Sequence, residues 1–271
     1  MGGKGAHLNT LLRLIRWVNY VATALSIRLV RWTGKSSHYV HPKHLVAETV
    51  GAAWYMHELQ RGDLVLDVGC GNGFHTLRAA TRCRFAVGLD LDDRLVRVAE
   101  DMRRRRQAQN AAFLRASAQA PLPFPDGLFD CVLLLDVLEH LVDRDRVLEE
   151  VRRVLRPGGT LLLSVPNADT GWKRRFRAAG LPTFADRDHK VEYTAESLQS
   201  DLTRVGFILA KGLQPVVYDT AWAGIIDFVG GISLRLYRRL LRWKIVMAER
   251  HPGDTTGFRA VWRKTESAGL S

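Results

Sequence analysis

The sequence predicts an α/β domain built on a doubly wound, mostly parallel sheet. Between residues 62 and 212, short apolar runs alternate with segments of helical periodicity, and a glycine-rich turn follows the first apolar run. Strands separated by helices form parallel βαβ units, and their crossover helices cover both faces of one sheet. The predicted strands are residues 64–69, 85–90, 112–117, 129–136 and 160–165.

Three helices are expected between these strands, at residues 74–82, 93–107 and 143–155. The last helix is broken by RPGG at residues 156–159, because proline and glycine favour a turn into the next strand. The alternating segment GFRAVWRK at residues 257–264 predicts one late strand.

A helical insertion is expected at about residues 219–250, before that late strand. The segment is strongly apolar and carries a basic stripe, made of Arg235, Arg238, Arg239, Arg242 and Lys244. Such a segment is typical of a lid over an apolar substrate, of a membrane contact, or of ordinary helix packing. The sequence leaves all three open.

Residues 1–45 are expected to form a basic amphipathic helical extension, ahead of the α/β domain at residues 46–271. Apolar residues recur at helical spacing from Leu11 to Trp32. The charged residues between positions 7 and 32 are all arginines, namely Arg13, Arg16, Arg28 and Arg31. A basic amphipathic helix with tryptophan is typical of a segment that lies in a membrane interface. The same pattern suits a helix that covers the domain or pairs with a second copy.

Composition indicates a globular protein with an anionic partner. In 271 residues, 40 Lys and Arg against 28 Asp and Glu give a formal charge of +12. This balance favours a membrane surface, a phosphorylated lipid or glycan, or RNA, unless it reflects a generally basic proteome. The arginine run at residues 103–106 lacks interleaved aromatic residues, so a nucleic acid is not the expected partner.

Cysteine usage and the N-terminal pattern predict a cytoplasmic location. Cys70, Cys83 and Cys131 are odd in number and have no metal-type spacing, which indicates reduced thiols. Arg13 and Arg16 interrupt the N-terminal apolar pattern, so we expect no secretory signal. No uncharged stretch is long enough to span a bilayer. Peripheral membrane association is the added expectation if the basic helix meets lipid.

The segment DVGCGNG at residues 67–73 follows an apolar strand and begins a helix. Gly69, Gly71 and Gly73 lack Cβ atoms, so the backbone of this turn can approach a ligand closely. Asp67 ends the first strand, where it could meet a cationic amino group. Asp90 ends the second strand, at the position that hydrogen-bonds ribose hydroxyls in nucleotide-binding α/β proteins. The turn alone also suits a nicotinamide oxidoreductase.

Five motifs in order, LDVGCGNG, VGLD, LPFPDGLFD, DVLEHL and LRPGG, resemble those of class I S-adenosylmethionine-dependent methyltransferases that act on small molecules. The resemblance covers about residues 60–210. It implies a seven-stranded Rossmann-like sheet with an antiparallel last strand, and S-adenosyl-L-methionine at the carboxyl ends of the first two strands. It also implies that Asp67 and the 69–73 turn hold the methionine part, and that Asp90 holds the ribose. Ser117 stands where the family often has the Asp that binds the adenine amine, and its hydroxyl can accept the same bond, so Ser117 is the expected adenine contact.

A second pattern predicts the catalytic or metal-binding groups. Asp136, Glu139 and His140 follow the apolar strand in LLLDVLEHL, at a spacing that shares one face of a helix, and His189 lies in DRDHKVEYT at 186–194. The two stretches together resemble the E-x-x-E-H motif and later histidine of small-RNA 3′-end 2′-O-methyltransferases. The first also resembles ubiquinone-biosynthesis O-methyltransferases.

In those families the acids and histidines are metal ligands, so the resemblance implies Mg²⁺ or Mn²⁺ held by Asp136, Glu139, His140 and His189. Asp136 replaces the family's first Glu. The alternatives are a metal-free base among His140, His189 and Asp136, or a structural role.

The sequence therefore predicts an S-adenosylmethionine-dependent methyltransferase. The expected reaction is O-methylation of a hydroxyl on a small, lipid-like or membrane-associated acceptor, such as a quinol, a lipid-linked sugar or a secondary metabolite. An RNA 2′-O-methyltransferase and a non-catalytic nucleoside-binding membrane adaptor are the alternatives.

Overall fold

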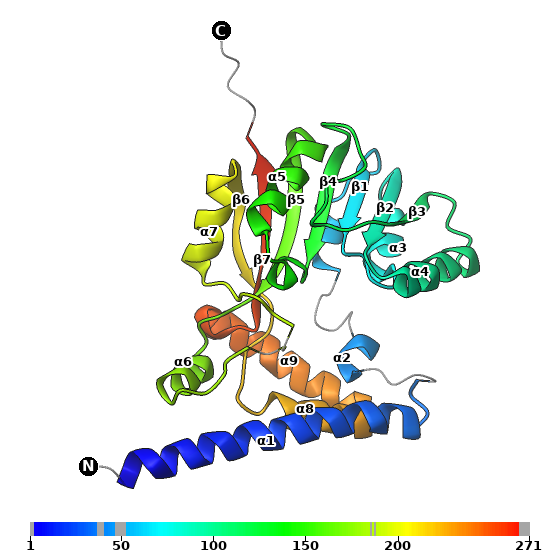
Figure 1. Cartoon of the computed structure of the whole chain (residues 1–271). Coiled ribbons are helices and arrows are strands. Elements are labelled where there is room, and N and C mark those ends of the chain that lie inside the picture. Colours follow the sequence, from blue (N-terminus) through cyan, green and yellow to red (C-terminus); the bar gives the residue numbers. More distant parts are fainter. Residues whose placement is uncertain (1–2, 37–40, 47–52, 185, 187, 266–271) are drawn as a thin grey trace. The chain divides into compact units, whose positions relative to one another are not determined.

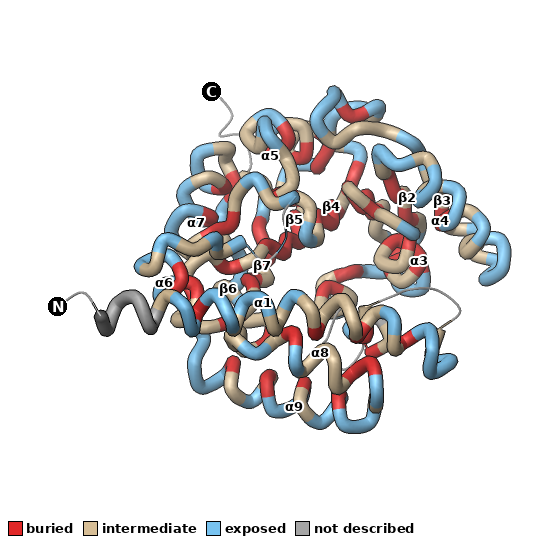
Figure 2. Tube along the Cα trace, turned by 60° about the horizontal axis from the view of Figure 1, so that its bottom comes forward, coloured by how far each residue is buried: buried red, intermediate tan, exposed pale blue. Residues whose placement is uncertain are grey.

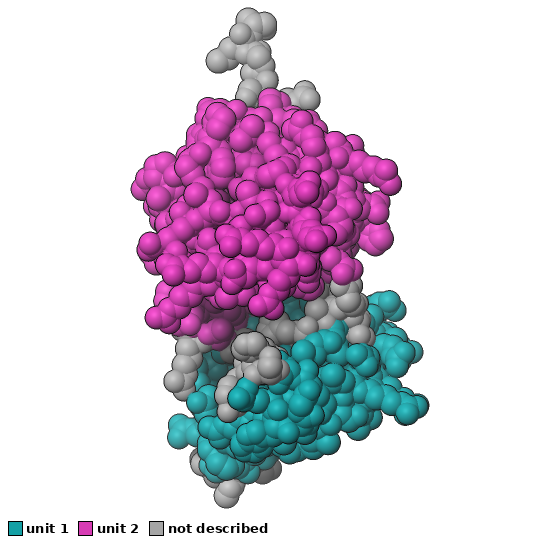
Figure 3. All heavy atoms as spheres, turned by 90° about the vertical axis from the view of Figure 1, so that its right-hand side faces the viewer, with its two compact units in different colours: residues 1–52, 168–185, 215–257 teal, residues 53–167, 186–214, 258–271 magenta. Residues whose placement is uncertain are grey.

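The computed structural model describes residues 3–36, 41–46, 53–184, 186 and 188–265 (Figure 1). The chain divides into two compact units (Figure 3). Unit 1 contains residues 1–52, 168–185 and 215–257, and unit 2 contains residues 53–167, 186–214 and 258–271.

Unit 2 is built on a seven-stranded sheet in the order β3-β2-β1-β4-β5-β7-β6. Its central strands are parallel, with β1 paired to β2 and β4, β2 to β3, and β4 to β5. The predicted doubly wound sheet is therefore confirmed. The strands are β1 Leu64–Val68, β2 Phe85–Asp90, β3 Ala111–Arg115, β4 Phe129–Leu135, β5 Leu155–Pro166, β6 Phe207–Pro215 and β7 Gly257–Lys264.

Strand β7 runs antiparallel to both of its neighbours. Lys264, at the end of β7, donates from Nζ to the carbonyl of Leu155 at the start of β5 (2.6 Å). The next residue, Thr265, donates its backbone N–H to the carbonyl of Gly206, just before β6 (3.2 Å). The expected antiparallel last strand is confirmed, and it places the start of β7 at the carboxyl edge of the parallel strands.

Strand β5 begins earlier than the sequence pattern predicts. The RPGG segment at residues 156–159 was expected to be a turn ahead of a strand at 160, but β5 already begins at Leu155. The extra residues are accommodated by a shift of register, since Phe129 pairs with Leu155 while Cys131 pairs with Thr160. Gly158 has the expected positive φ, at +68°.

Helices cover both faces of this sheet, which explains why its strands are apolar on both sides. One face packs against α5 Arg144–Val154 and α7 Ala195–Arg204, and the other against η2 Trp54–His57 and α3 Phe74–Ala80. Helix α4, Asp93–Arg105, packs beside β3. Helix α7 begins with a capping box between Thr194 and Ser197.

Unit 1 is helical. It contains α1 Gly3–Trp32, α2 Pro42–Leu45, α6 Gly171–Ala178, α8 Ala223–Ile232, α9 Leu234–Arg250 and η4 Pro252–Asp254. The sequence treated the N-terminal helix and the 219–250 insertion as separate additions, whereas the structure gathers both into one unit with residues 168–185. Within the described residues, no helix has both the length and the apolarity that crossing a bilayer requires.

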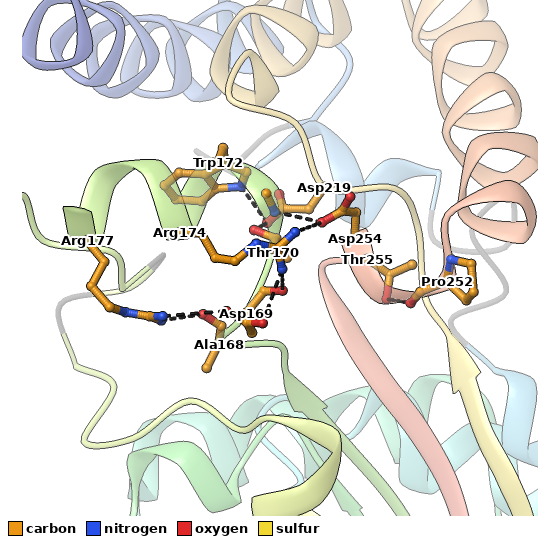
Figure 4. A network of polar contacts seen from close by, with 11 residues as sticks. Ala168, Asp169, Thr170, Trp172, Arg174, Arg177, Asp219, Pro252, Asp254 and Thr255 are labelled. Carbon is orange, nitrogen blue, oxygen red and sulfur yellow. Dashed lines mark hydrogen bonds and ion pairs between the residues drawn. The ribbon is translucent and has the colours of Figure 1, made fainter. Parts of the chain in front are cut away.

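A polar network holds residues 168–178 in unit 1 (Figure 4). Asp219 accepts hydrogen bonds from Thr170 Oγ1 (3.0 Å) and Trp172 Nε1 (2.6 Å). Asp254 accepts one from the backbone N–H of Gly171 (2.7 Å) at the start of α6. Two aspartates from distant parts of the chain thus fix the beginning of this helix.

Candidate active site

The glycine-rich turn joins β1 to α3 in a left-handed conformation. Gly69, Gly71 and Gly73 have φ values of +75°, +53° and +77°. A Cβ on Gly69 would lie 2.5 Å from Val137 Cγ2, and one on Gly73 would lie 2.6 Å from the ring of Phe113. Both positions therefore require glycine for close packing, as well as for φ. At Gly71 a Cβ would meet nothing within 4 Å, so this backbone lies against open space.

Asp67 is buried beneath the turn, with 2% of its surface exposed. Its Oδ2 accepts a hydrogen bond from Thr76 Oγ1 of α3 at 2.6 Å. Burial raises the pKa of Asp67 to about 7, although the bond from Thr76 opposes this rise. The arrangement ties β1 to α3, and the expected contact with the methionine part stays a prediction.

Asp90 and Ser117 lie on one cleft of about 270 Å³ at the carboxyl edge of the sheet. One oxygen of the Asp90 carboxylate accepts from the backbone N–H of Gly71 (2.8 Å), and the other accepts from that of Asp92 (2.9 Å). Asp90 is thus fixed against the glycine turn. The structure brings both predicted cofactor residues to the same cleft as Gly69 and His140.

Asp136 lines the other side of this cleft, directly after β4. Its φ is +54°, a left-handed conformation that is uncommon for a residue with a side chain and costs free energy. Ser164 of β5 donates from Oγ to Asp136 Oδ1 (2.8 Å), and its carbonyl accepts from the Asp136 N–H (3.0 Å). This pair of bonds holds the exposed carboxylate in place.

Glu139, His140 and His189 form a group whose potential ligand atoms all lie within 4.8 Å of one another. Asp136 is not part of this group but lines the same cleft as His140, so the four-residue site stays a prediction. The predicted shared helical face fails because Asp136 turns left-handed and only the 3₁₀ helix η3, Leu138–His140, follows. Three of the four predicted ligands, namely Glu139, His140 and His189, therefore lie close together.

Glu139 is almost fully buried, with 2% of its surface exposed. Burial, together with the nearby carboxylate of Asp136, raises the pKa of Glu139 to about 8. Among the described residues, Glu139 Oε2 has no hydrogen-bond partner. One carboxylate and two imidazoles are ligand types of transition-metal sites, whereas Mg²⁺ prefers oxygen ligands, so the expected divalent cation stays a prediction.

The sequence prediction missed Glu192, which contacts His189. Glu192 Oε1 lies 3.1 Å from His189 Nδ1, and both side chains are largely buried. A carboxylate on one ring nitrogen fixes the orientation and the tautomer of the imidazole. The spacing of three residues within DRDHKVEYT was the available signal.

A further histidine near Asp136 was also missed. His75, the second residue of α3, lies 3.0 Å through Nδ1 from the hydroxyl of the buried Tyr55. Burial lowers the pKa of His75 to about 4, while the charge of Asp136 opposes this and that of Arg259 adds to it. His75, Asp136 and Arg259 come from α3, the end of β4 and the start of β7, and no local motif links them.

Comparison with known proteins identifies the domain. Residues 66–163 match the family described as "Methyltransferase domain". The chain is 38% identical over 106 residues to 27-O-demethylrifamycin SV methyltransferase of Amycolatopsis mediterranei, covering 39% of each protein. It is 34% identical over 126 residues to demethylmenaquinone methyltransferase of Listeria welshimeri, covering 44% of this chain and 52% of the relative. The chain thus spans about half, or less, of the length of these relatives.

The fold agrees with this family. The crystal structure of the [4+2]-cyclase SpnF superposes with a TM-score of 0.59 at 23% identity, covering 80% of this chain and 82% of that one. This likeness shows the fold alone, since a cyclase catalyses a different reaction. The matched domain, the glycine turn with Asp90 and the sheet order agree, and the chain therefore contains a class I S-adenosylmethionine-dependent methyltransferase domain.

Proposed function

We propose that the protein transfers a methyl group from S-adenosyl-L-methionine to a small acceptor. The main support is the cleft that Gly69, Asp90, Ser117 and His140 share at the carboxyl edge of the sheet. S-adenosylmethionine fits these residues, since Asp90 can accept from ribose hydroxyls and the open space at Gly71 admits a ligand against the backbone. The bound cofactor would supply the methyl group. The protein would hold the cofactor and the acceptor in position and would provide a group that accepts the acceptor's proton.

Transfer from isotope-labelled S-adenosylmethionine tests this function. Binding with transfer supports it, and binding without transfer to any extracted acceptor favours a nucleoside-binding adaptor. A comparison of lipids, metabolites and RNA from cells with and without the gene identifies the acceptor by its gain of one CH₂ unit. Methylated RNA would favour the 2′-O-methyltransferase alternative, and no binding of S-adenosylmethionine would contradict the proposal.

We further propose that the reaction is O-methylation of a lipid-like or membrane-associated acceptor. One relative is named as the methyltransferase of an O-demethylated rifamycin, and another as the methyltransferase of demethylmenaquinone. A hydroxyl acceptor must lose its proton, which requires a base or a cation. His140 lines the cleft and contacts the ring of His189, so this pair is the proposed acceptor of the proton, either directly or through a divalent ion held with Glu139.

Peripheral attachment to the cytoplasmic face of a membrane is part of the same proposal. Helix α1 buries Leu12, Ala22 and Val30 and exposes Arg13 and Trp17 on the opposite side. A basic side with an exposed indole suits an anionic lipid surface.

Salt-dependent sedimentation with anionic vesicles tests this attachment. Substitutions such as Arg13→Gln and Arg28→Gln are better suited than truncation, because α1 packs on α8 and its removal would expose the core of unit 1. Full-length protein that ignores anionic vesicles at low salt would leave α1 as a packing or dimer helix.

A further inference from the structure

Helix α8 lies beside α1 in unit 1 at a distance that only glycine permits (Figure 2). A Cβ on Gly224 would overlap the carbonyl oxygen of Asn19, and one on Gly231 would lie 2.8 Å from that of Ser26. Asn19 also accepts, through Oδ1, a hydrogen bond from the N–H of Gly224 (2.8 Å). One side of α8 is therefore occupied by α1.

A second side of α8 is occupied by α9 and α2. The ring of Tyr237 in α9 and Pro42 of α2 both approach Gly230. Tyr237 donates its hydroxyl proton to Asp227 (2.8 Å), which also lies 3.1 Å from His41 Nε2. The single charged residue of α8 thus points into the unit, where these two polar groups contact it.

The remaining side of α8 is exposed and entirely apolar. Trp222, Ile225 and Ile232 form what we call the insertion ridge, and they are 49%, 37% and 56% exposed. At 100° per residue, Ile225 and Ile232 lie on one line along the helix, away from both glycine contacts. Phe228 and Val229 flank this line and are half-buried.

The two helices that pack against α8 are rich in basic and aromatic residues. Helix α1 has no acidic residue, and α9 has one, Glu249. Directly after Ile232, a shallow depression of about 360 Å³ is lined by Ser233, Arg235, Leu236 and Arg239. The exposed tryptophans of the described chain all belong to this unit, and they are Trp17, Trp32, Trp222 and Trp243.

We propose that the insertion ridge enters the headgroup region of an anionic lipid bilayer, while the arginines at the start of α9 contact lipid phosphates. Positive charge without acidic neighbours complements an anionic surface, and indole rings favour the membrane interface. The proposal rests on the membrane-associated acceptor proposed above, and it assigns the contact to α8 and α9 as well as α1. A second copy of the chain is the competing occupant.

The experiment uses the full chain and vesicles of phosphatidylcholine with or without phosphatidylglycerol. The ridge variant carries Trp222→Ser, Ile225→Ser and Ile232→Ser. The matched control carries Leu95→Ser, Leu128→Ser and Ile208→Ser, which removes three apolar side chains of 37%, 39% and 53% exposure from unit 2. We expect the ridge variant to lose at least about tenfold in partitioning, because each buried apolar group contributes to insertion, while the control keeps it.

A charge variant with Arg235→Gln and Arg239→Gln should lose binding to anionic vesicles in the same assay. If the ridge variant does not fold, quenching of tryptophan fluorescence by bromine-labelled lipid decides instead, and Trp222→Phe should remove part of that quenching. Unchanged partitioning of a folded ridge variant, or unchanged quenching in Trp222→Phe, would overturn the proposal.

Two controls separate this inference from the proposed function. Gel filtration tests the competing occupant. If the wild type is a dimer that does not bind vesicles, and the ridge variant is a monomer, the ridge is a subunit interface and the inference is overturned. Calorimetry of S-adenosylmethionine binding reports on the methyltransferase site alone. Vesicle binding without cofactor binding contradicts the proposed methyl transfer. Cofactor binding without vesicle binding contradicts the ridge inference and the membrane attachment of α1, but not methyl transfer.

Discussion

The rings of His140 and His189 lie 4.9 Å apart between centroids, inclined at 72°. One follows β4 and the other precedes α7, so the sheet brings together two imidazoles that the chain separates widely. At this distance both imidazoles can reach one metal ion, and either imidazole can equally act as a metal-free base. The first prediction decides between these two.

Replacing His189 with Ala should lower the rate of methyl transfer by about 10²–10⁴-fold, the usual contribution of a positioned proton acceptor. His57→Ala, which removes an exposed histidine from the same unit, is the matched control and should keep the rate. If the wild-type rate falls with EDTA and returns with Mg²⁺ or Mn²⁺, a metal is required. Activity that survives both EDTA and His189→Ala would make the cluster structural.

Asp90→Ala should weaken the binding of S-adenosylmethionine by roughly 1–3 kcal/mol, because ribose hydroxyls would lose their acceptor in a partly buried cleft. The substitution also removes the acceptor of the Gly71 N–H, which loosens the glycine turn. Isothermal titration calorimetry measures the effect. Asp101→Ala on the exposed side of α4 is the control, and equal affinities for both variants would refute the role of Asp90.

Asp67 makes the stability of the ligand-free protein depend on pH. Its pKa rises from 3.8 to about 7 on folding because of burial, so the folded state favours the protonated acid. The stabilisation is complete below pH 3.8 and is lost as pH rises through about 7, so unfolding should become easier between these values. The total change is on the order of 4 kcal/mol, at about 1.4 kcal/mol per pKa unit.

Urea denaturation at several pH values checks this, with Asp67→Asn as the test variant. Asparagine keeps an oxygen for the Thr76 hydroxyl and cannot ionise, so the variant should lose this part of the pH dependence. A variant whose stability falls with pH as steeply as the wild type would assign the effect to another group.

Asp219→Ala should destabilise the protein by about 1–3 kcal/mol, because Thr170 and Trp172 lose their acceptor and the buried Lys173 and Lys244 lose a nearby negative charge. Burial already lowers the pKa of Lys244, and Asp219 opposes that shift. Asp169→Ala removes an exposed partner of Arg174 and Arg177 nearby and should cost at most about 1 kcal/mol. Thermal denaturation compares the two, and equal losses would contradict the account.

Much of the fold could be predicted from local patterns. The strands of unit 2 are apolar runs of the right length, and their glycine turn and caps are coded within a few residues. The meeting of Asp90 and Ser117 at one cleft could also be predicted, because one ends β2, the other follows β3, and the carboxyl ends of parallel strands share one edge.

The rest depends on tertiary structure. The left-handed φ of Asp136 is supported by Ser164 on the neighbouring strand, and spacing within LLLDVLEHL cannot reveal it. The partnership of Tyr55 with His75 arises from the packing of the 3₁₀ helix η2 against α3. Residues 168–185 join the helical unit through Asp219 and Asp254, which lie far along the chain. Long-range contacts of this kind leave no periodic trace in the sequence.

The position of β7 between β5 and β6 imposes an order on folding during synthesis. Strand β6 lacks its sheet partner until residues 257–264 have left the ribosome, because β7 separates it from β5. Helices α8 and α9 emerge in the interval, while β5 still presents an open edge. The nascent chain therefore carries α8 and α9 before the sheet of unit 2 is complete, and β5 and β6 are joined only when β7, the last strand, inserts between them.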